Sequence, residues 1–114
     1  PDMMPVEVIC KTKNNPAPSL SAEVMGSTNI IVGWIHLTHN FADAETIGIK
    51  PVENLEITIK KEITGIFQVE FWDTTTGQIV SSISNTFSNN VLILNIPIFQ
   101  RDIAFKVFKI PRDN

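Results

Sequence analysis

Apolar and polar residues alternate along two stretches of the chain with the two-residue period of a β-strand. In residues 55–60 every second residue, beginning with Leu55, is apolar, and a polar or charged residue follows each one. Residues 66–72 repeat the pattern, with Phe71 on the apolar face and Trp72 on the opposite face. This spacing predicts two strands that each turn one face to a core and the other to water.

Shorter apolar runs occupy much of the remaining chain, at intervals of about 8 to 12 residues with turn residues between them. Such spacing is typical of a β-sandwich or barrel and not of alternating strands and helices. We therefore predict an all-β fold, a two-sheet antiparallel sandwich of about seven or eight strands, immunoglobulin-like or jelly-roll-like. It forms one domain over residues 1–114, with residues 1–20 partly irregular. The other predicted strands are Val6–Cys10, Leu20–Met25, Asn29–Thr38, Gln78–Asn85, Val91–Ile96 and Asp102–Ile110.

The stretch from Asn29 to Thr38 is almost continuously apolar and contains Trp34. Strands buried on both faces have this pattern, so we expect a central strand with Trp34 in the core. A turn is expected where the run Ser88–Asn90 interrupts the apolar pattern, and Gly65 precedes the second alternating strand. The single cysteine, Cys10, is expected to be buried as a small apolar side chain and excludes an internal disulfide.

Composition supports strands and excludes two kinds of partner. Ile, Val and Thr number 17, 9 and 10, against five each of Leu and Ala, and β-branched residues favour a pleated surface. The net charge of -3 offers no basic field for nucleic acid and no polybasic segment for a membrane. No window approaches the roughly 18 apolar residues that span a bilayer. Because the chain begins with Pro1, we expect a processed product or part of a longer protein.

Residues suited to catalysis or metal binding are few. His36 and His39, with Asp43 and Glu45 nearby, are the one local group of metal-ligand types, and a zinc site is the hypothesis they suggest. An offset of three residues on a strand points side chains to opposite faces, which favours ordinary histidines at a strand end. No nucleophile elbow, phosphate-binding glycine loop or Cys pair is present. We predict no catalytic residue, no metal and no cofactor in this chain.

Two tryptophans and one charged pair are the remaining candidates. Trp34 and Trp72, with His36 beside the first, could contact a glycan through flat aromatic faces, or cover the sheet and dock on another domain. The absence of tyrosine lowers the expectation of a glycan surface. Arg101 and Asp102 precede the last predicted strand, where an Arg-carboxylate pair could fix a chain reversal or reach a partner.

Four segments, taken in order, carry a family resemblance: Gly33–His36, then Gly65 with Gln68–Gly77, then Leu92–Pro97, then Arg101–Val107. They resemble the C-terminal β-sandwich accessory domains of bacterial (β/α)-barrel glycoside hydrolases, a group that includes domains described as collagen-binding. The similarity covers about residues 24 to 110, and Phe67 stands where these domains often have tyrosine.

The resemblance implies a non-catalytic accessory domain, not itself an enzyme, that docks on or stabilises the catalytic barrel of the same polypeptide. It implies a bacterial protein that is secreted, periplasmic or at the cell surface, with polysaccharide as a second partner. Asp73 would cap a hairpin turn in which Gly77 takes the left-handed conformation. An autonomous carbohydrate-binding or adhesion module is the alternative hypothesis.

Overall fold

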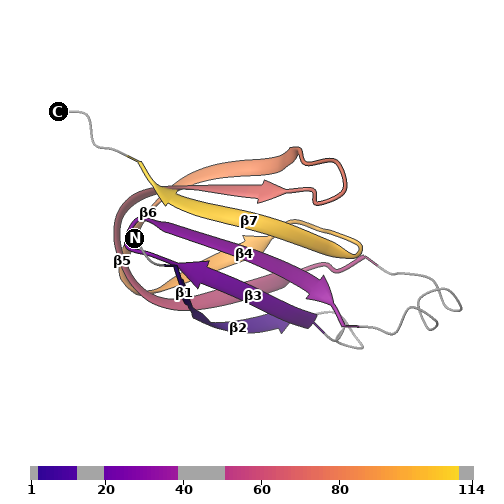
Figure 1. The fold of residues 1–114 in the computed structure, drawn as a ribbon, viewed down its shortest axis with the longest axis horizontal. Helices are drawn as coiled ribbons and strands as arrows, with labels where there is room; N and C mark the ends of the chain where they lie inside the picture. Colours follow the sequence, from indigo (N-terminus) through magenta and orange to yellow (C-terminus); the bar gives the residue numbers. More distant parts are fainter. Residues whose placement is uncertain (1–2, 13–19, 39–50, 111–114) are drawn as a thin grey trace, which may run out of the picture.

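The computed structural model describes residues 3–12, 20–38 and 51–110, and within them the side chains outside residues 62–63 and 85–90. These ranges form strands and no helix, so none of their elements is a helix long and apolar enough to cross a membrane. The strands, shown in Figure 1, are β1 (Met4–Pro5), β2 (Glu7–Thr12), β3 (Leu20–Gly26), β4 (Ile30–Leu37), β5 (Leu55–Trp72), β6 (Ile79–Ile96) and β7 (Asp102–Lys109).

The strands build two antiparallel sheets packed face to face, which confirms the predicted sandwich. The long β5–β6 hairpin curves through both layers, as its sweep around one end of Figure 1 shows. Residues 67–72 of β5 pair with β7 and residues 55–60 pair with β2. The large sheet therefore has the order β1-β3-β4-β7-β5-β6, and the small sheet has the order β2-β5-β6.

The N-terminal segment also passes from one sheet to the other. Pro5 of β1 pairs with Met25 in the large sheet, and two residues later Glu7 of β2 pairs with Lys60 in the small sheet. Between them the Val6 N–H donates to the Val24 carbonyl oxygen at 2.9 Å. The segment thus connects the two layers along one side of the sandwich (Figure 1).

The turn expected at Ser88–Asn90 is wrong, because β6 continues through it as one strand. The two strands predicted at residues 55–60 and 66–72 are likewise one strand, β5. The hairpin bends there instead, through an irregularity of register between Lys60 and Ile63 and a positive φ of 129° at Gly65. Hydrogen bonds between the backbones of two strands form whether or not their side chains are apolar. A segment that passes from one sheet to the other has no core beside it, so neither of its faces needs apolar side chains. Its side-chain pattern is therefore lost while its hydrogen bonds continue.

The core lies between the sheets, and both predicted alternations point into it as expected. Phe67, Val69 and Phe71 face it from the large sheet and Leu55, Ile57 and Ile59 from the small sheet, each no more than 2% exposed. The other buried apolar side chains complete one continuous cluster: Val24, Ile31, Ile35, Val52, Leu92, Leu94, Ile96, Phe99, Ile103, Phe105 and Val107.

The prediction that β4 is buried on both faces is wrong. Ile31 and Ile35 are buried, but Trp34 is 41% exposed on the opposite face. Within the described ranges no second layer covers that outer face of the large sheet. Gly33 faces inward between the two isoleucines, where a Cβ would overlap the ring of Phe105. The run is apolar because the inner face is core and the outer face carries an exposed aromatic side chain.

Cys10 is likewise exposed, against expectation. It lies on β2, an edge strand of the small sheet, opposite Ile57. A position at the rim of the sandwich leaves the residue open to solvent, although neighbouring atoms desolvate its sulfur and raise the pKa of the thiol.

Candidate functional site

Three adjacent strands bring the two tryptophans of the chain to the same outer face of the large sheet. Trp34 on β4 and Trp72 on β5 both pair directly with Ala104 on β7, one from each side. Directly opposed residues share a face, and Ala104 has only a methyl side chain between the two indoles. We call Trp34, Ala104 and Trp72 the aromatic row. The sequence showed both tryptophans but not their juxtaposition, because they are far apart along the chain.

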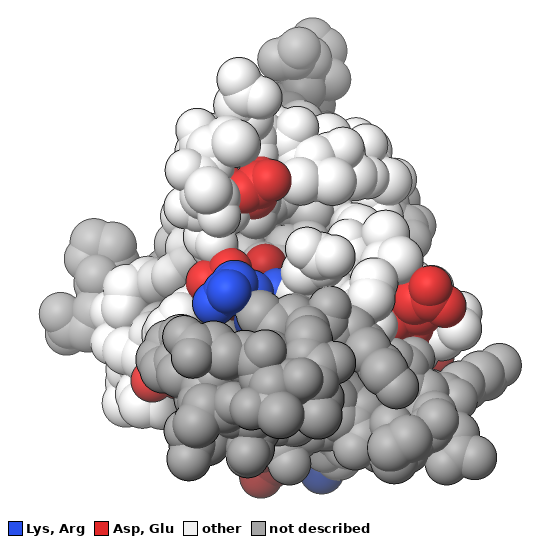
Figure 2. Space-filling model, turned by 90° about the vertical axis from the view of Figure 1, so that its right-hand side faces the viewer, with Lys and Arg blue, Asp and Glu red and all other residues white. Residues whose placement is uncertain are grey.

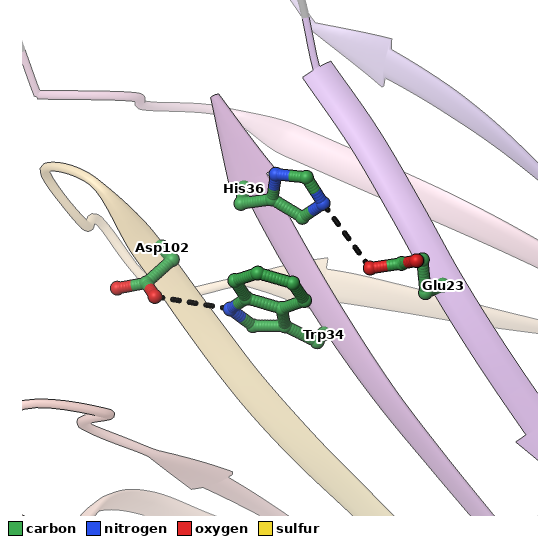
Figure 3. A network of polar contacts seen from close by, with 4 residues as sticks. All are labelled: Glu23, Trp34, His36 and Asp102. Atoms are coloured by element: carbon green, nitrogen blue, oxygen red, sulfur yellow. Dashed lines mark hydrogen bonds and ion pairs between the residues drawn. The ribbon is translucent and has the colours of Figure 1, made fainter. Parts of the chain in front are cut away.

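Trp34 is fixed by a set of contacts drawn in Figure 3. Its indole Nε1–H donates to Oδ2 of Asp102 at 3.0 Å. Its ring stacks on His36, with centroids 3.9 Å apart and planes inclined by 22°. His36 Nε2 in turn lies 3.3 Å from Oε2 of Glu23 on β3. An exposed indole is thereby held in one orientation from two sides, by residues of three strands.

The loop between β5 and β6 reaches the same group of residues. Thr74 donates its hydroxyl to Oδ1 of Asp102 at 2.5 Å, so both carboxylate oxygens of Asp102 are engaged. Asp73 shapes this loop, since its Oδ1 accepts from the backbone N–H groups of Thr75 and Thr76 at 2.8 and 3.2 Å. Gly77 has φ 73° and donates its N–H to the Asp73 carbonyl oxygen at 2.8 Å.

Arg101 takes no part in an ion pair within the described residues, so the proposed pair with Asp102 does not form there. Its guanidinium lies at the surface, and its backbone carbonyl accepts from the Leu37 N–H at 3.1 Å. This backbone contact links the end of β4 to the residue that precedes β7. The partners of the Asp102 carboxylate are Trp34 and Thr74 instead.

The zinc hypothesis receives no support from the residues that can be placed. Among the described residues no three His, Cys, Asp or Glu side chains lie together in a group that could hold a metal ion. His36 belongs to the contacts around Trp34, while His39, Asp43 and Glu45 lie outside the described residues. His36 contacts an aromatic ring, that of Trp34, and a carboxylate, that of Glu23. Such contacts suit a residue that orients Trp34 or touches a ligand.

Charged side chains are few on the described part of the one end of the sandwich that Figure 2 shows. Figure 2 views the end of the sandwich at the right of Figure 1, and on its described part the acidic and basic side chains stand in small separate groups. Two open pockets lie elsewhere, and each mixes apolar side chains with charges of both signs, such as Glu7 and Lys61 in one and Lys11 and Glu53 in the other. Neither contains a residue of the aromatic row.

A second exposed group, on the outer face of the small sheet, was missed from the sequence. Ile9 on β2 and Ile93 on β6 lie directly opposite Thr58 of β5, one on each side. Val91, two residues before Ile93 on β6, points to the same face. They are 48%, 53% and 40% exposed in the order Ile9, Ile93, Val91. We call these three residues the isoleucine patch. The continuous apolar run of residues 91–94 could have indicated this exposed group. A strand with one face in the core and one in water would alternate apolar and polar residues instead.

Comparisons with known proteins give a likeness of fold. A scan against models of protein families and a search of curated proteins gave no match. Among solved structures, the chain is similar to part of alpha-L-fucosidase isoenzyme 2 from Paenibacillus thiaminolyticus, with a TM-score of 0.55 and 6% sequence identity. The alignment covers 91% of this chain but 15% of the fucosidase. At this identity the likeness shows the sandwich fold and leaves the family open.

Proposed function

We propose that this chain is a non-catalytic accessory β-sandwich of a carbohydrate-active enzyme, and that it docks on the catalytic domain of the same polypeptide. The observation that carries the proposal is the likeness of nearly the whole chain to a small part of a glycoside hydrolase. The sequence resemblance around the aromatic row points to the same class of domain.

The isoleucine patch supports docking. Ile9, Val91 and Ile93 present β-branched side chains to solvent on the face of a sheet of three strands. The Glu7–Lys60 ion pair, 3.0 Å long, borders the patch. A group of apolar side chains with a charged border is typical of surfaces that meet another protein. We assign this face to the catalytic domain.

The free edge of β6 supports the same function. Among the described residues β6 pairs only with β5, although it is 18 residues long. Its sequence contains no Lys, Arg, Asp, Glu, Pro or Gly. Soluble proteins usually protect a long edge strand with charges, prolines or bulges, because unpaired backbone groups invite another strand. The pairing of β5 with β6 has two irregularities of register, but β6 carries no charge or proline, so a neighbouring domain over this edge would complete its protection.

The first test is the complete open reading frame that encodes this chain. We expect it to contain a barrel-length segment with catalytic carboxylates; an open reading frame without one would contradict the proposal. The second test uses the complete polypeptide and compares Ile93→Lys with Ile98→Lys, a matched control at an exposed isoleucine outside the patch. We expect Ile93→Lys to lower the unfolding temperature of the catalytic domain by several degrees.

In the isolated 114-residue chain both substitutions should leave stability nearly unchanged, since exposed positions usually tolerate substitution within about 0.5 kcal/mol. This comparison separates loss of docking from damage to the sandwich. If Ile93→Lys and Ile98→Lys behave alike in the complete polypeptide, the isoleucine patch is not the docking face.

A further inference from the structure

We propose that the aromatic row, together with Asp102, is a binding site for a neutral oligosaccharide. The site lies on the outer face of the large sheet, and the isoleucine patch lies on the outer face of the small sheet. Binding at the one does not require docking at the other. The proposal therefore goes beyond the accessory role, and it applies equally to a chain that acts alone.

The spacing of the two indoles suits a sugar chain. Trp34 and Trp72 each neighbour Ala104 across one strand, so their Cα atoms are separated by about two strand spacings, roughly 10 Å. That separation is close to the length of a disaccharide unit. The Ala104 methyl is the smallest side chain that a strand offers between them short of glycine, so it does not block the space above the sheet.

The site is already ordered without a ligand. The hydrogen bond to Asp102 and the stack on His36 hold the Trp34 ring, and Thr74 holds Asp102. An exposed aromatic side chain fixed in this way loses little further conformational freedom when it binds, which favours recognition by a rigid surface. Core packing does not explain the arrangement, because Trp34 is 41% exposed.

The polar groups beside the indoles are acceptors suited to hydroxyl groups. The Asp102 carboxylate has about four acceptor positions, and Trp34 and Thr74 use two of them. Hydroxyl groups of a sugar could use the others while its apolar C–H face lies on an indole. One row further along the sheet, Glu70 of β5 stands directly opposite Lys106 of β7 in the strand register.

Charge decides which sugars are favoured. Among the described strand residues of this face, the carboxylates of Glu23, Glu70 and Asp102 lie around the aromatic row, together with the ammonium of Lys106. Lys106 directs its Nζ over the ring of Phe108, 5.2 Å from its centroid. A uronate or sulfated chain would meet net negative charge here, so the expected ligand is uncharged.

Both tryptophans of the chain belong to the site, so intrinsic tryptophan fluorescence and the indole N–H resonances report on it directly. The experiment titrates the 114-residue chain with cellohexaose, xylohexaose and mannohexaose, with polygalacturonate and choline as comparison ligands. We expect at least one neutral hexasaccharide to shift the Trp34 indole N–H signal with a dissociation constant in the millimolar range or tighter. Polygalacturonate should bind at least tenfold more weakly.

Three variants locate the binding. Trp34→Ala and Trp72→Ala should each weaken it at least tenfold. Ala104→Glu keeps both indoles and leaves the core untouched, and it should abolish binding by placing a charged side chain between them. Thr58→Glu is its matched control, at the centre of the outer face of the small sheet.

The outcomes separate the possibilities. If none of the three hexasaccharides shifts either indole signal, the proposal is overturned, whatever the docking experiments find. Binding of choline without any sugar would replace the sugar with a quaternary ammonium ligand held by the aromatic faces. Sugar binding that survives Ala104→Glu would place the site elsewhere on the molecule.

Discussion

The indole Nε1–H of Trp34 donates a 3.0 Å hydrogen bond to Oδ2 of Asp102, a residue 68 positions further along the chain. The bond joins the end of β4 to the start of β7, and Thr74 extends it to the β5–β6 loop. A single carboxylate thus fixes the orientation of an exposed aromatic ring and anchors a hairpin. Removing the Asp102 carboxylate should therefore change both the environment of Trp34 and the stability of the β5–β6 hairpin.

Asp102→Ala should destabilise the chain by about 1–2 kcal/mol, because it removes two hydrogen bonds that each contribute about 0.5–1.5 kcal/mol and are partly screened by water. Asp102→Asn retains one acceptor oxygen and should cost about half as much. Urea unfolding measures both, and the tryptophan emission of folded Asp102→Ala should shift to longer wavelength as Trp34 loosens. If Asp102→Ala unfolds like the unchanged protein, the carboxylate does not hold this junction.

Gly33→Ala should destabilise the chain by about 1–3 kcal/mol, the usual cost of forcing extra volume into a packed core. The reason is steric, since a Cβ at residue 33 would overlap the ring of Phe105, its direct partner across β4 and β7. The test is a double-mutant cycle with Phe105→Leu, measured by urea unfolding. Gly33→Ala should cost less in the Phe105→Leu background, and strict additivity of the two losses would contradict the overlap.

Gly77→Ala should destabilise the β5–β6 loop by about 1–2 kcal/mol for a different reason. Gly77 has φ 73°, and nothing lies within 4 Å of a Cβ placed there. The cost is therefore conformational and not steric, and Gly77→Asn should lose less because asparagine tolerates the left-handed region. Thermal unfolding of the two variants should rank them in that order; equal losses would argue against backbone strain.

Cys10 should react slowly for an exposed thiol. Desolvation raises the pKa of its thiol, so at any pH below that pKa a smaller fraction is thiolate than in an unfolded chain. The rate of alkylation by iodoacetamide increases as the thiolate forms. When this rate is plotted against pH, the midpoint of the increase should therefore lie at a higher pH for the folded chain than for the chain in urea. Since Cys10 is the chain's single cysteine, the reaction has one possible site. Coincident pH profiles would show that the sulfur is fully hydrated.

The strands with one buried face were predictable because their inward side chains repeat with the period of the backbone. The alternation alone is enough to place two sets of side chains on the core face: Phe67, Val69 and Phe71, and Leu55, Ile57 and Ile59. The turn chemistry of Asp73 and Gly77 is local in the same sense, since its hydrogen bonds span no more than five residues. The β-sandwich class follows from these local patterns and from the content of β-branched residues.

The position of Trp34 was not predictable, because an apolar residue in an apolar run looks the same whether its face is covered or open. Likewise, the residues between the two halves of β5 look like a turn but continue as a bent strand, because backbone pairing with β6 does not depend on side-chain pattern.

The sequence by itself determined where most of the strand residues lie, which face of most strands is apolar, and how the loop after Trp72 closes. These properties depend on neighbours a few positions away. Only the tertiary structure decided that β5 and β6 bend through both sheets and that Trp34 and Trp72 flank Ala104. It also decided that Asp102 bonds to Trp34 and Thr74 and not to Arg101. The physical reason is that strand order and register, which the alternation of one strand does not encode, set which distant side chains share a face.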